Sequence, residues 1–154
     1  MRKPSISLLS QAVFVPLLWT AAASAFLWAE PGVSAPVAAA AKTYSPAVRK
    51  GNTVYVAGQT PNDQKTGEIV GVTIEEQTKQ VIQNIEAILK KEGMTLSNVV
   101  STTVYLSDLN NLKRMNRVYS IAFGLSPVPP ARTAIQISRL PGDALIEITV
   151  IAVD

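Results

Sequence analysis

Two charged side chains interrupt apolar stretches in the C-terminal part of the chain. Arg132 stands at the head of an uncharged run, and Glu147 lies within a segment that otherwise reads as a buried strand. Burying either charge is costly unless it is paired or meets a ligand. A guanidinium binds a carboxylate through two parallel hydrogen bonds, and a carboxylate can hold or deprotonate a water. On rigid strands near a sheet end, the two residues suit a site for a small carboxylate substrate; a structural Arg132–Glu147 ion pair is the alternative.

The composition excludes several kinds of chemistry. The chain has 154 residues, which suits one domain with a real core, and it contains no His and no Cys. These absences exclude a Ser-His-Asp triad, a His-ligated zinc, a thiol nucleophile, a disulfide and an iron–sulfur cluster. The net charge of +3 is too small for the electrostatic footprint of a nucleic-acid-binding domain, so no nucleic-acid partner is expected.

Residues 1–41 have the composition of an export signal followed by a tether. Arg2 and Lys3 precede an apolar stretch at residues 6–29, which contains a small-residue cleavage motif around Ser24. We expect a cleaved signal peptide and therefore a periplasmic or secreted protein. The alternative is an uncleaved anchor, since the stretch is long enough to span a bilayer, with the domain facing the periplasm. The membrane would then be contacted only through residues 6–29.

The domain from 42 to 154 begins with a predicted hairpin and a helix. A Gly-Asn turn predicts a hairpin between residues 44–48 and 53–57. Thr73 and Glu76 form a capping box that begins the first helix, and Gly93 suits the position just beyond its end. The expected apolar face of this helix consists of Ile74, Val81, Ile85, Ile88 and Leu89.

The second half of the domain continues with a strand, a helix and two more strands. The Val- and Thr-rich segment 99–106 predicts a strand, and Asp108 suits the N-cap of a second helix. A proline-rich connector ends this helical region, and strands are expected at 132–137 and 144–153. The expected inner face of the second helix consists of Leu112, Met115, Tyr119, and Ala122 or Phe123, with Gly124 as its stop.

The resulting order, β-β-α-β-α-β-β, predicts an α+β fold built as a two-layer sandwich, because both helices must cover a sheet face. In the last strand the residues that point to either face of the sheet are apolar, and two helices can cover only one of these faces. Self-association through the uncovered face is therefore expected. Glu147 is predicted to lie on the same face as Leu145 and Thr149.

Several motifs in this order resemble the RidA/YjgF family of reactive-intermediate deaminases. The resemblance covers the chain from Tyr44 to the C-terminus. The most specific part is the succession of three short motifs along the chain: Pro-Ala-Arg, then Arg-Leu-Pro, then Ile-Glu-Ile. The matching segments are 44–47, 56–61, 65–68, 102–109, 115–119, 130–133, 139–141 and 146–148.

The resemblance implies a chorismate-mutase-like fold and a homotrimer with a barrel-like core and clefts between subunits. It also implies an enzyme that acts on carbon–nitrogen bonds, like a 2-iminobutanoate/2-iminopropanoate deaminase. Such an enzyme hydrolyses 2-imino acids and their enamine tautomers to 2-oxo acids and ammonia, with no metal or cofactor. An imine is already electrophilic, so the enzyme has to position the reactants more than supply a strong nucleophile.

The family's functional residues match five positions. Arg132 matches the arginine that grips the substrate carboxylate, and Glu147 matches the glutamate that holds the attacking water. Tyr44 matches a tyrosine lining the cleft, although it could simply be a rim aromatic. Gly58 lies where the family's backbone approaches substrate, or where a strand end requires a turn. Asn116 matches a residue near the pocket, or is a polar residue on a helix.

Two departures and the export signal distinguish this chain from familiar members. Ala134 replaces a frequent Cys, and Ala57 replaces a frequent Ser before the cleft glycine. The export signal separates the protein from the cytosolic enzymes that release enamines, so the source of its substrate is open. The competing hypothesis is a non-catalytic trimeric binding module for small carboxylates or a protein partner.

Overall fold

The computed structural model describes residues 43–124 and 126–154 of the chain. The predicted export signal and tether therefore lie outside the described residues. The order of strands and helices is the predicted β-β-α-β-α-β-β, with short 3₁₀ turns between some of them. The strands are β1 (Ala47–Lys50), β2 (Thr53–Gln59), β3 (Val99–Leu106), β4 (Ala131–Gln136) and β5 (Ile146–Val153), and the helices are α1 (Ile74–Lys91) and α2 (Leu112–Phe123).

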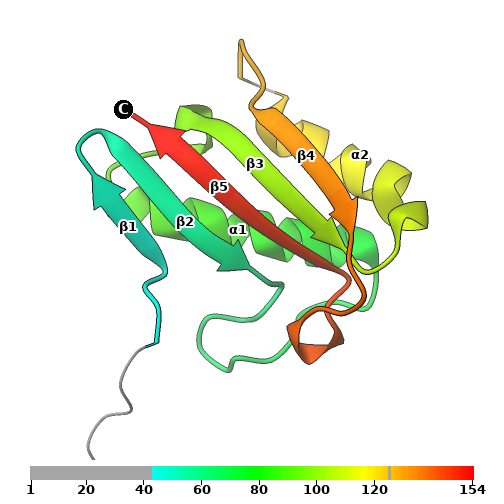
Figure 1. Cartoon of the computed structure of the whole chain (residues 1–154). Helices are drawn as coiled ribbons and strands as arrows, with labels where there is room; N and C mark the ends of the chain where they lie inside the picture. The colour runs from blue at the N-terminus through cyan, green and yellow to red at the C-terminus, as the bar shows by residue number, and fades with distance from the viewer. Residues whose placement is uncertain (1–42, 125) are drawn as a thin grey trace, which may run out of the picture. The chain divides into compact units, whose positions relative to one another are not determined.

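The five strands form one mixed sheet in the order β1-β2-β5-β3-β4. All neighbouring strands are antiparallel except β3 and β4, which α2 connects as a parallel pair. Both helices pack on the same side of this sheet (Figure 1). The α+β two-layer sandwich predicted from the sequence is confirmed, and β4 becomes an edge strand lying next to α2.

Helix α1 begins and ends where the sequence indicates. Thr73 accepts a hydrogen bond from the Glu76 N–H, and the Glu76 side chain returns to the backbone of Thr73, which completes the capping box. Gly93 has a φ of +74°, the left-handed conformation that follows many helix ends. All five residues predicted for the apolar face are buried. This face forms the main contact between α1 and the sheet.

The start of α2 differs from the prediction. Asp108 caps a 3₁₀ turn at Leu109–Asn111 by accepting a hydrogen bond from the Asn110 N–H, and α2 itself begins at Leu112. The side chain of Asp108 satisfies the tighter turn first, so the α-helix has no side-chain cap of its own. Its predicted inner face is nevertheless correct, since Met115, Tyr119 and Phe123 are buried.

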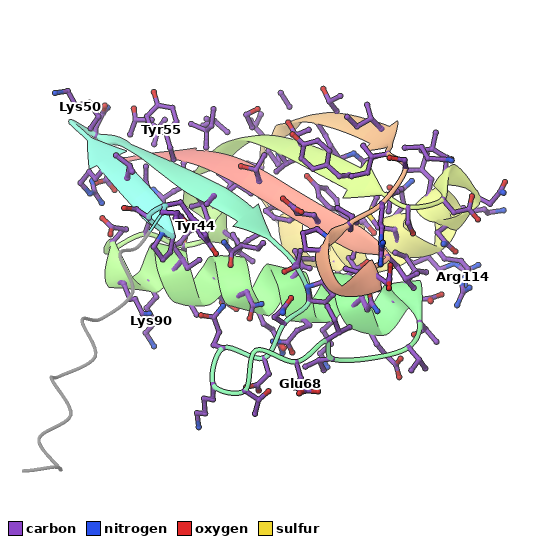
Figure 2. All side chains as sticks on the ribbon, turned by 60° about the horizontal axis from the view of Figure 1, so that its bottom comes forward. Tyr44, Lys50, Tyr55, Glu68, Lys90 and Arg114 are labelled. Atoms are coloured by element: carbon purple, nitrogen blue, oxygen red, sulfur yellow. The ribbon has the colours of Figure 1, made fainter. Side chains whose placement is uncertain are left out.

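No helix among the described residues covers the opposite face of the sheet. Along β5 the residues alternate between fully buried and partly buried, and the buried set faces the helices. The partly buried set includes Glu147, Thr149 and Ile151, as the sequence parity predicts. Tyr55 on β2 is 51% exposed and projects from the sheet on the side away from α1 (Figure 2). An apolar sheet face of this kind is a surface for association.

Two buried amide side chains of α1 hold the long segment that connects β2 to α1. Asn84 donates hydrogen bonds to the backbone oxygens of Thr60 and Asn62. Gln77 donates to the Gly71 oxygen and accepts from the Leu145 N–H. These side chains satisfy backbone groups that have no partner in the sheet. Neither residue was predicted to have a role, because an amide on a helix has no periodic signature.

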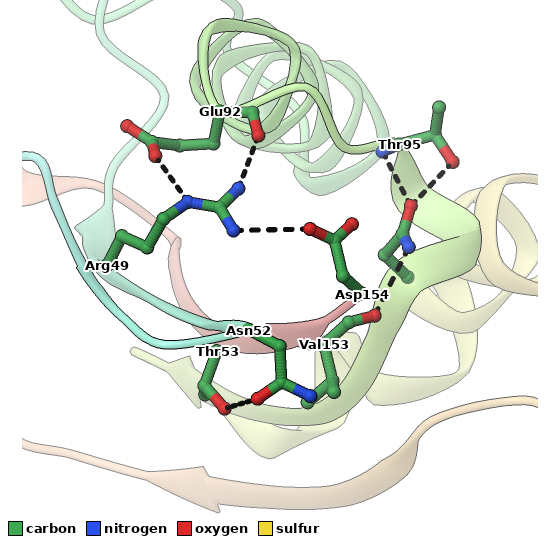
Figure 3. Close-up of polar contacts among 8 residues, drawn as sticks. Arg49, Asn52, Thr53, Glu92, Thr95, Val153 and Asp154 are labelled. Atoms are coloured by element: carbon green, nitrogen blue, oxygen red, sulfur yellow. Dashed lines mark hydrogen bonds and ion pairs between the residues drawn. The ribbon is translucent and has the colours of Figure 1, made fainter.

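A small network of charges ties the first hairpin to the end of α1. Arg49 contacts Glu92 and Asp154, at 3.2 Å for each ion pair (Figure 3). It also donates to the backbone oxygen of Glu92. The edge strand β1 is thus fixed to the helix layer, and the hairpin is held in place.

None of the helices among the described residues is long and apolar enough to cross a membrane. The alternative of a membrane anchor concerned only residues 6–29, which lie outside the described part.

Candidate active site

The guanidinium of Arg132 lies over α2. Arg132 extends from the start of β4, and its Nη1 donates to the Asn116 Oδ1 at 2.7 Å. Its Cζ lies 4.7 Å from the centroid of the Tyr119 ring, a cation–π geometry. The residue is exposed, which corrects the expectation of a buried charge: β4 is an edge strand and solvent reaches it. Arg132 has no carboxylate partner in the described part of the chain.

The Tyr119 ring beneath Arg132 is itself fixed. It is 7% exposed, and its hydroxyl and the Thr102 hydroxyl are hydrogen-bonded at 2.7 Å. The Phe123 ring packs against it with centroids 4.5 Å apart. Burial raises the pKa of the Tyr119 hydroxyl, and the Thr102 hydrogen bond and the charge of Arg132 offset part of this effect. The hydroxyl therefore stays protonated at neutral pH.

Glu147 lies near the start of β5 on the uncovered face. Its carboxylate forms no hydrogen bond with any described residue, and burial alone raises its pKa. A carboxylate whose pKa is raised by burial is a stronger base than an exposed one, which suits it to accept a proton. Such a group is also costly to the fold, which is why it marks a candidate site.

Gly58 provides the space that Glu147 occupies. The register between β2 and β5 shifts between Val56 and Gln59, so Ala57 and Gly58 together form a β-bulge opposite β5. A Cβ added at Gly58 would overlap the Glu147 carboxylate, and would lie 2.8 Å from its Cδ. The bulge and the missing side chain thus bring the backbone of β2 against Glu147. A lone glycine inside a strand pattern is a signal for such a bulge.

Arg132 and Glu147 do not meet within one chain. Arg132 pairs with Thr102 of β3, whereas Glu147 pairs with Tyr105 of the same strand. Standard strand geometry then separates their Cα atoms by about 14 Å, and their side chains project from opposite faces. The predicted common sheet end is wrong, because β4 begins beside the start of β3 and β5 begins beside its end. The alternative of a structural ion pair is wrong for the same reason.

The other two predicted residues divide between these places. Asn116 lies with Arg132, on α2. Tyr44 is 73% exposed and lines, together with Gly58 and Asn84, a mostly polar cavity of about 270 Å³. Each chain therefore places Arg132 beside Asn116 in one location, and Glu147 against Gly58 in another.

No group of three or more acidic side chains that could hold a metal ion occurs among the described residues. Tyr119, which lies beneath Arg132, and its hydrogen-bond partner Thr102 were not among the predicted residues. Tyr119 has the spacing of a helix core residue, and the sequence offers no sign of which aromatic residue lies beneath an arginine.

A mixed sheet with both helices on one face, carrying an arginine at its edge and a glutamate on its open face, defines an α+β domain of the RidA/YjgF type. The chain belongs to the Endoribonuclease L-PSP family, whose model matches residues 34–154. The RidA/YjgF resemblance noted in the sequence is thereby confirmed.

Three relatives illustrate the similarity. A RutC family protein of Pyrococcus abyssi is 56% identical over 109 residues, which are 71% of this chain and 84% of the relative. The 2-iminobutanoate/2-iminopropanoate deaminase of Mus musculus is 40% identical over 115 residues, covering 75% of this chain and 84% of the relative. The structure of Escherichia coli TdcF with bound serine has a TM-score of 0.69 and 33% identity, and covers 75% of this chain and 91% of that one.

These relatives consist almost entirely of the domain described above. We therefore expect the segment from residue 42 to 154 to fold on its own, and it is the form used in the experiments below.

Proposed function

We propose that this protein hydrolyses reactive 2-imino acids and their enamine tautomers to 2-oxo acids and ammonia. The observation that carries the proposal is a pair of charged groups with no ion-pair partner among the described residues: a guanidinium with an open edge at Arg132 and a half-buried carboxylate at Glu147. The deaminase name of the mouse relative supports the same reaction. The TdcF structure contains bound serine, which is also an amino-acid carboxylate.

We further propose that the site is shared between subunits of a homotrimer. Arg132 and Glu147 project from opposite faces, so a common site needs the arginine of one subunit and the glutamate of its neighbour. The open sheet face around Tyr55, Thr149 and Ile151 provides an apolar surface through which copies can associate. In such a trimer the open faces together would form the barrel-like core.

The reaction needs only groups that this chain supplies. Arg132 holds the substrate carboxylate through its open edge, and Glu147 accepts a proton from water as the water oxygen attacks the imine carbon. With the imine in its protonated form, the carbon–nitrogen π electrons move to nitrogen and give a neutral carbinolamine. The protonated Glu147 then returns its proton to that nitrogen. The carbon–nitrogen single bond breaks with its electron pair on nitrogen, ammonia leaves, and the remaining hydroxyl gives its proton to the Glu147 carboxylate as it becomes the 2-oxo group.

Tyr44 and Asn116 have supporting roles in this proposal. Tyr44 is an exposed ring on the rim of the Gly58 cavity, where it can cover a substrate side chain. Asn116 accepts the hydrogen bond from Nη1 of Arg132, so that the other guanidinium nitrogens are left to bind the carboxylate. The substrate class is therefore a small 2-imino acid, and neither a metal nor a cofactor takes part in the proposed steps.

The first test is the release of 2-oxo acid and ammonia by residues 42–154, with imino acids generated in situ by an amino-acid oxidase. Arg132→Ala should lower kcat/KM by about 30-fold to 1000-fold, since a lost contact to a charged group costs about 2–4 kcal/mol. Wild-type-like turnover by this variant would refute the assigned role. Incubation of the same protein with single-stranded RNA tests the activity named in the family description.

The shared site has its own test in mixed trimers. Arg132→Ala and Glu147→Gln subunits are each expected to form inactive trimers. When the two variants are unfolded together and refolded, some clefts combine the intact arginine of one subunit with the intact glutamate of the other. Recovery of part of the wild-type activity would establish the shared site, whereas no recovery from a properly assembled mixture would place both groups in one chain's site.

The alternative function is a non-catalytic trimeric module that binds small carboxylates or a protein partner. Arg132 would serve in the same way, but Glu147 would be dispensable. Catalysis requires both residues, whereas carboxylate binding should survive Glu147→Gln and be lost in Arg132→Ala.

We also propose that the protein is exported, on the basis of the basic start and apolar stretch at residues 2–29. The mass of the protein recovered from the producing cells distinguishes a cleaved signal from an anchor. Recovery of the intact chain in the soluble cytosolic fraction would contradict export.

A further inference from the structure

We propose that Tyr119 is a positioning residue for Arg132. Its ring serves as a fixed platform that aims the open edge of the guanidinium at a ligand carboxylate. The inference rests on the proposed function for the identity of the ligand and deepens it. It adds Tyr119 and its anchor, Thr102, to the five residues that match the family pattern.

The platform is rigid because it is held at three points. The ring is almost completely buried, Phe123 packs against it, and its hydroxyl shares a 2.7 Å hydrogen bond with Thr102. Thr102 is 2% exposed and belongs to β3, the strand next to Arg132. A ring fixed to both the helix and the sheet cannot follow the guanidinium if the arginine moves.

The two contacts of Arg132 restrain different motions. The stack on Tyr119, at 4.7 Å from Cζ to the ring centroid, restrains the tilt of the guanidinium plane. The Asn116 hydrogen bond to Nη1 restrains rotation within that plane. Together they leave Nε and Nη2 without a partner among the described residues. These two nitrogens form one of the edges that match a carboxylate.

An exposed arginine on an edge strand would otherwise sample many rotamers. Ordering such a side chain on binding costs affinity, and a platform that orders it beforehand removes part of this cost. The carboxylate is gripped equally in the bound substrate and in the transition state. Loss of the platform should therefore raise KM and leave kcat nearly unchanged.

The decisive variant is Tyr119→Leu, which keeps an apolar side chain but removes the ring. We expect KM to rise about tenfold, in keeping with a partly desolvated cation–π contact. Tyr119→Phe keeps the ring and should restore most of the lost affinity. An unchanged KM in Tyr119→Leu, or a fall in kcat alone, would overturn the inference.

The anchor is tested by Thr102→Val, which removes the hydroxyl at nearly constant volume. Thr102→Val and Tyr119→Phe break the same hydrogen bond, so each should raise KM by about twofold and the double variant should be no worse than either. Additive effects would show that Thr102 acts independently of Tyr119. Val81→Ala, on the buried face of α1, is the matched control: it should lower thermal stability without changing KM.

A binding measurement separates failure of this inference from failure of the proposed function. Calorimetric titration with 2-oxobutanoate and with its uncharged amide reports on carboxylate recognition without turnover. Wild type should prefer the acid, Arg132→Ala should lose that preference, and Tyr119→Leu should lose most of it. If wild type binds the acid but hydrolyses no imine, only the proposed reaction fails. If Tyr119→Leu binds the acid as wild type does, only the proposed role of Tyr119 is refuted. If wild type does not bind the acid, both the proposed function and the role of Tyr119 are overturned.

Discussion

The backbone of Gly58 lies directly against the carboxylate of Glu147, so that any side chain at position 58 would occupy the same space. The φ of Gly58 is not in the left-handed region, so an alanine there is compatible with the backbone. We predict that Gly58→Ala displaces the carboxylate and lowers kcat/KM by about 100-fold, the effect of a misplacement of about 1 Å. Steady-state deaminase kinetics measure this loss.

A second glycine variant provides the control. Gly51 has a φ of +60° and open space around it, so Gly51→Ala strains the hairpin turn without touching Glu147. It should cost about 1 kcal/mol of stability and leave kcat/KM unchanged. Equal kinetic losses in both variants would mean that strand distortion, and not the carboxylate, is responsible.

The raised pKa of Glu147 predicts a pH dependence for activity. Only the ionised carboxylate accepts a proton from water, so kcat/KM should fall as the pH drops through the pKa of Glu147. Burial sets this pKa above its ordinary value of 4.5. The measurement is the pH–rate profile of 2-oxo acid release. An acidic limb at or below 4.5 would contradict the assignment.

The raised pKa of Glu147 affects stability in the opposite direction: activity should rise with pH, whereas the contribution of Glu147 to stability should fall. The folded state binds the Glu147 proton more tightly than the unfolded state does, so stability from this group is present at low pH. It is lost as the pH rises from about 4.5 through the raised pKa. Glu147→Gln should therefore unfold at a higher temperature than wild type at pH 7 and show no such advantage at pH 4. Thermal melts at the two pH values test this.

Charge on the open sheet face should prevent assembly. Ile151 lies on the uncovered face of β5, so Ile151→Glu would place a carboxylate in the proposed interface, where an unpaired charge is costly. We predict monomers in analytical ultracentrifugation and loss of deaminase activity. Ile121→Glu introduces the same charge on the exposed side of α2 and should stay assembled. A trimeric Ile151→Glu variant would contradict the proposed interface.

The buried amide of Asn84 predicts an effect on stability. Asn84→Leu leaves the backbone oxygens of Thr60 and Asn62 without their donor. We expect a loss of about 1–3 kcal/mol in urea unfolding, because buried acceptors then lack partners. Gln83→Leu, at an exposed position on the same helix, should change stability by less than about 0.5 kcal/mol.

Local signals in the sequence predicted most of the fold. The capping box at Thr73, the apolar face of α1 and the strand 99–106 are all read from neighbouring residues, and each agrees with the structure. Element ends were less accurate. The first strand was predicted at 44–48 but forms at Ala47–Lys50, because the tight turn determines which residues pair.

The arrangement of the site depended on sheet order, which local signals do not contain. Arg132 and Glu147 were expected together, on rigid strands near a sheet end. The structure places β3 between β4 and β5 and makes β4 parallel to β3, which sends the two starts to opposite ends. The positions of the strand starts depend on long-range strand pairing. The residue types could therefore indicate the chemistry of the site but not where Arg132 and Glu147 lie relative to each other.

The placement of Arg132 and Glu147 on opposite faces has a consequence for how much activity a cell obtains from each chain. Under the proposed function, a newly made chain carries every catalytic group and is nevertheless inert. Its activity appears only when copies meet, so specific activity should fall on dilution below the dissociation constant of the assembly. The amount of protein present would then control the reaction more steeply than in proportion to its concentration.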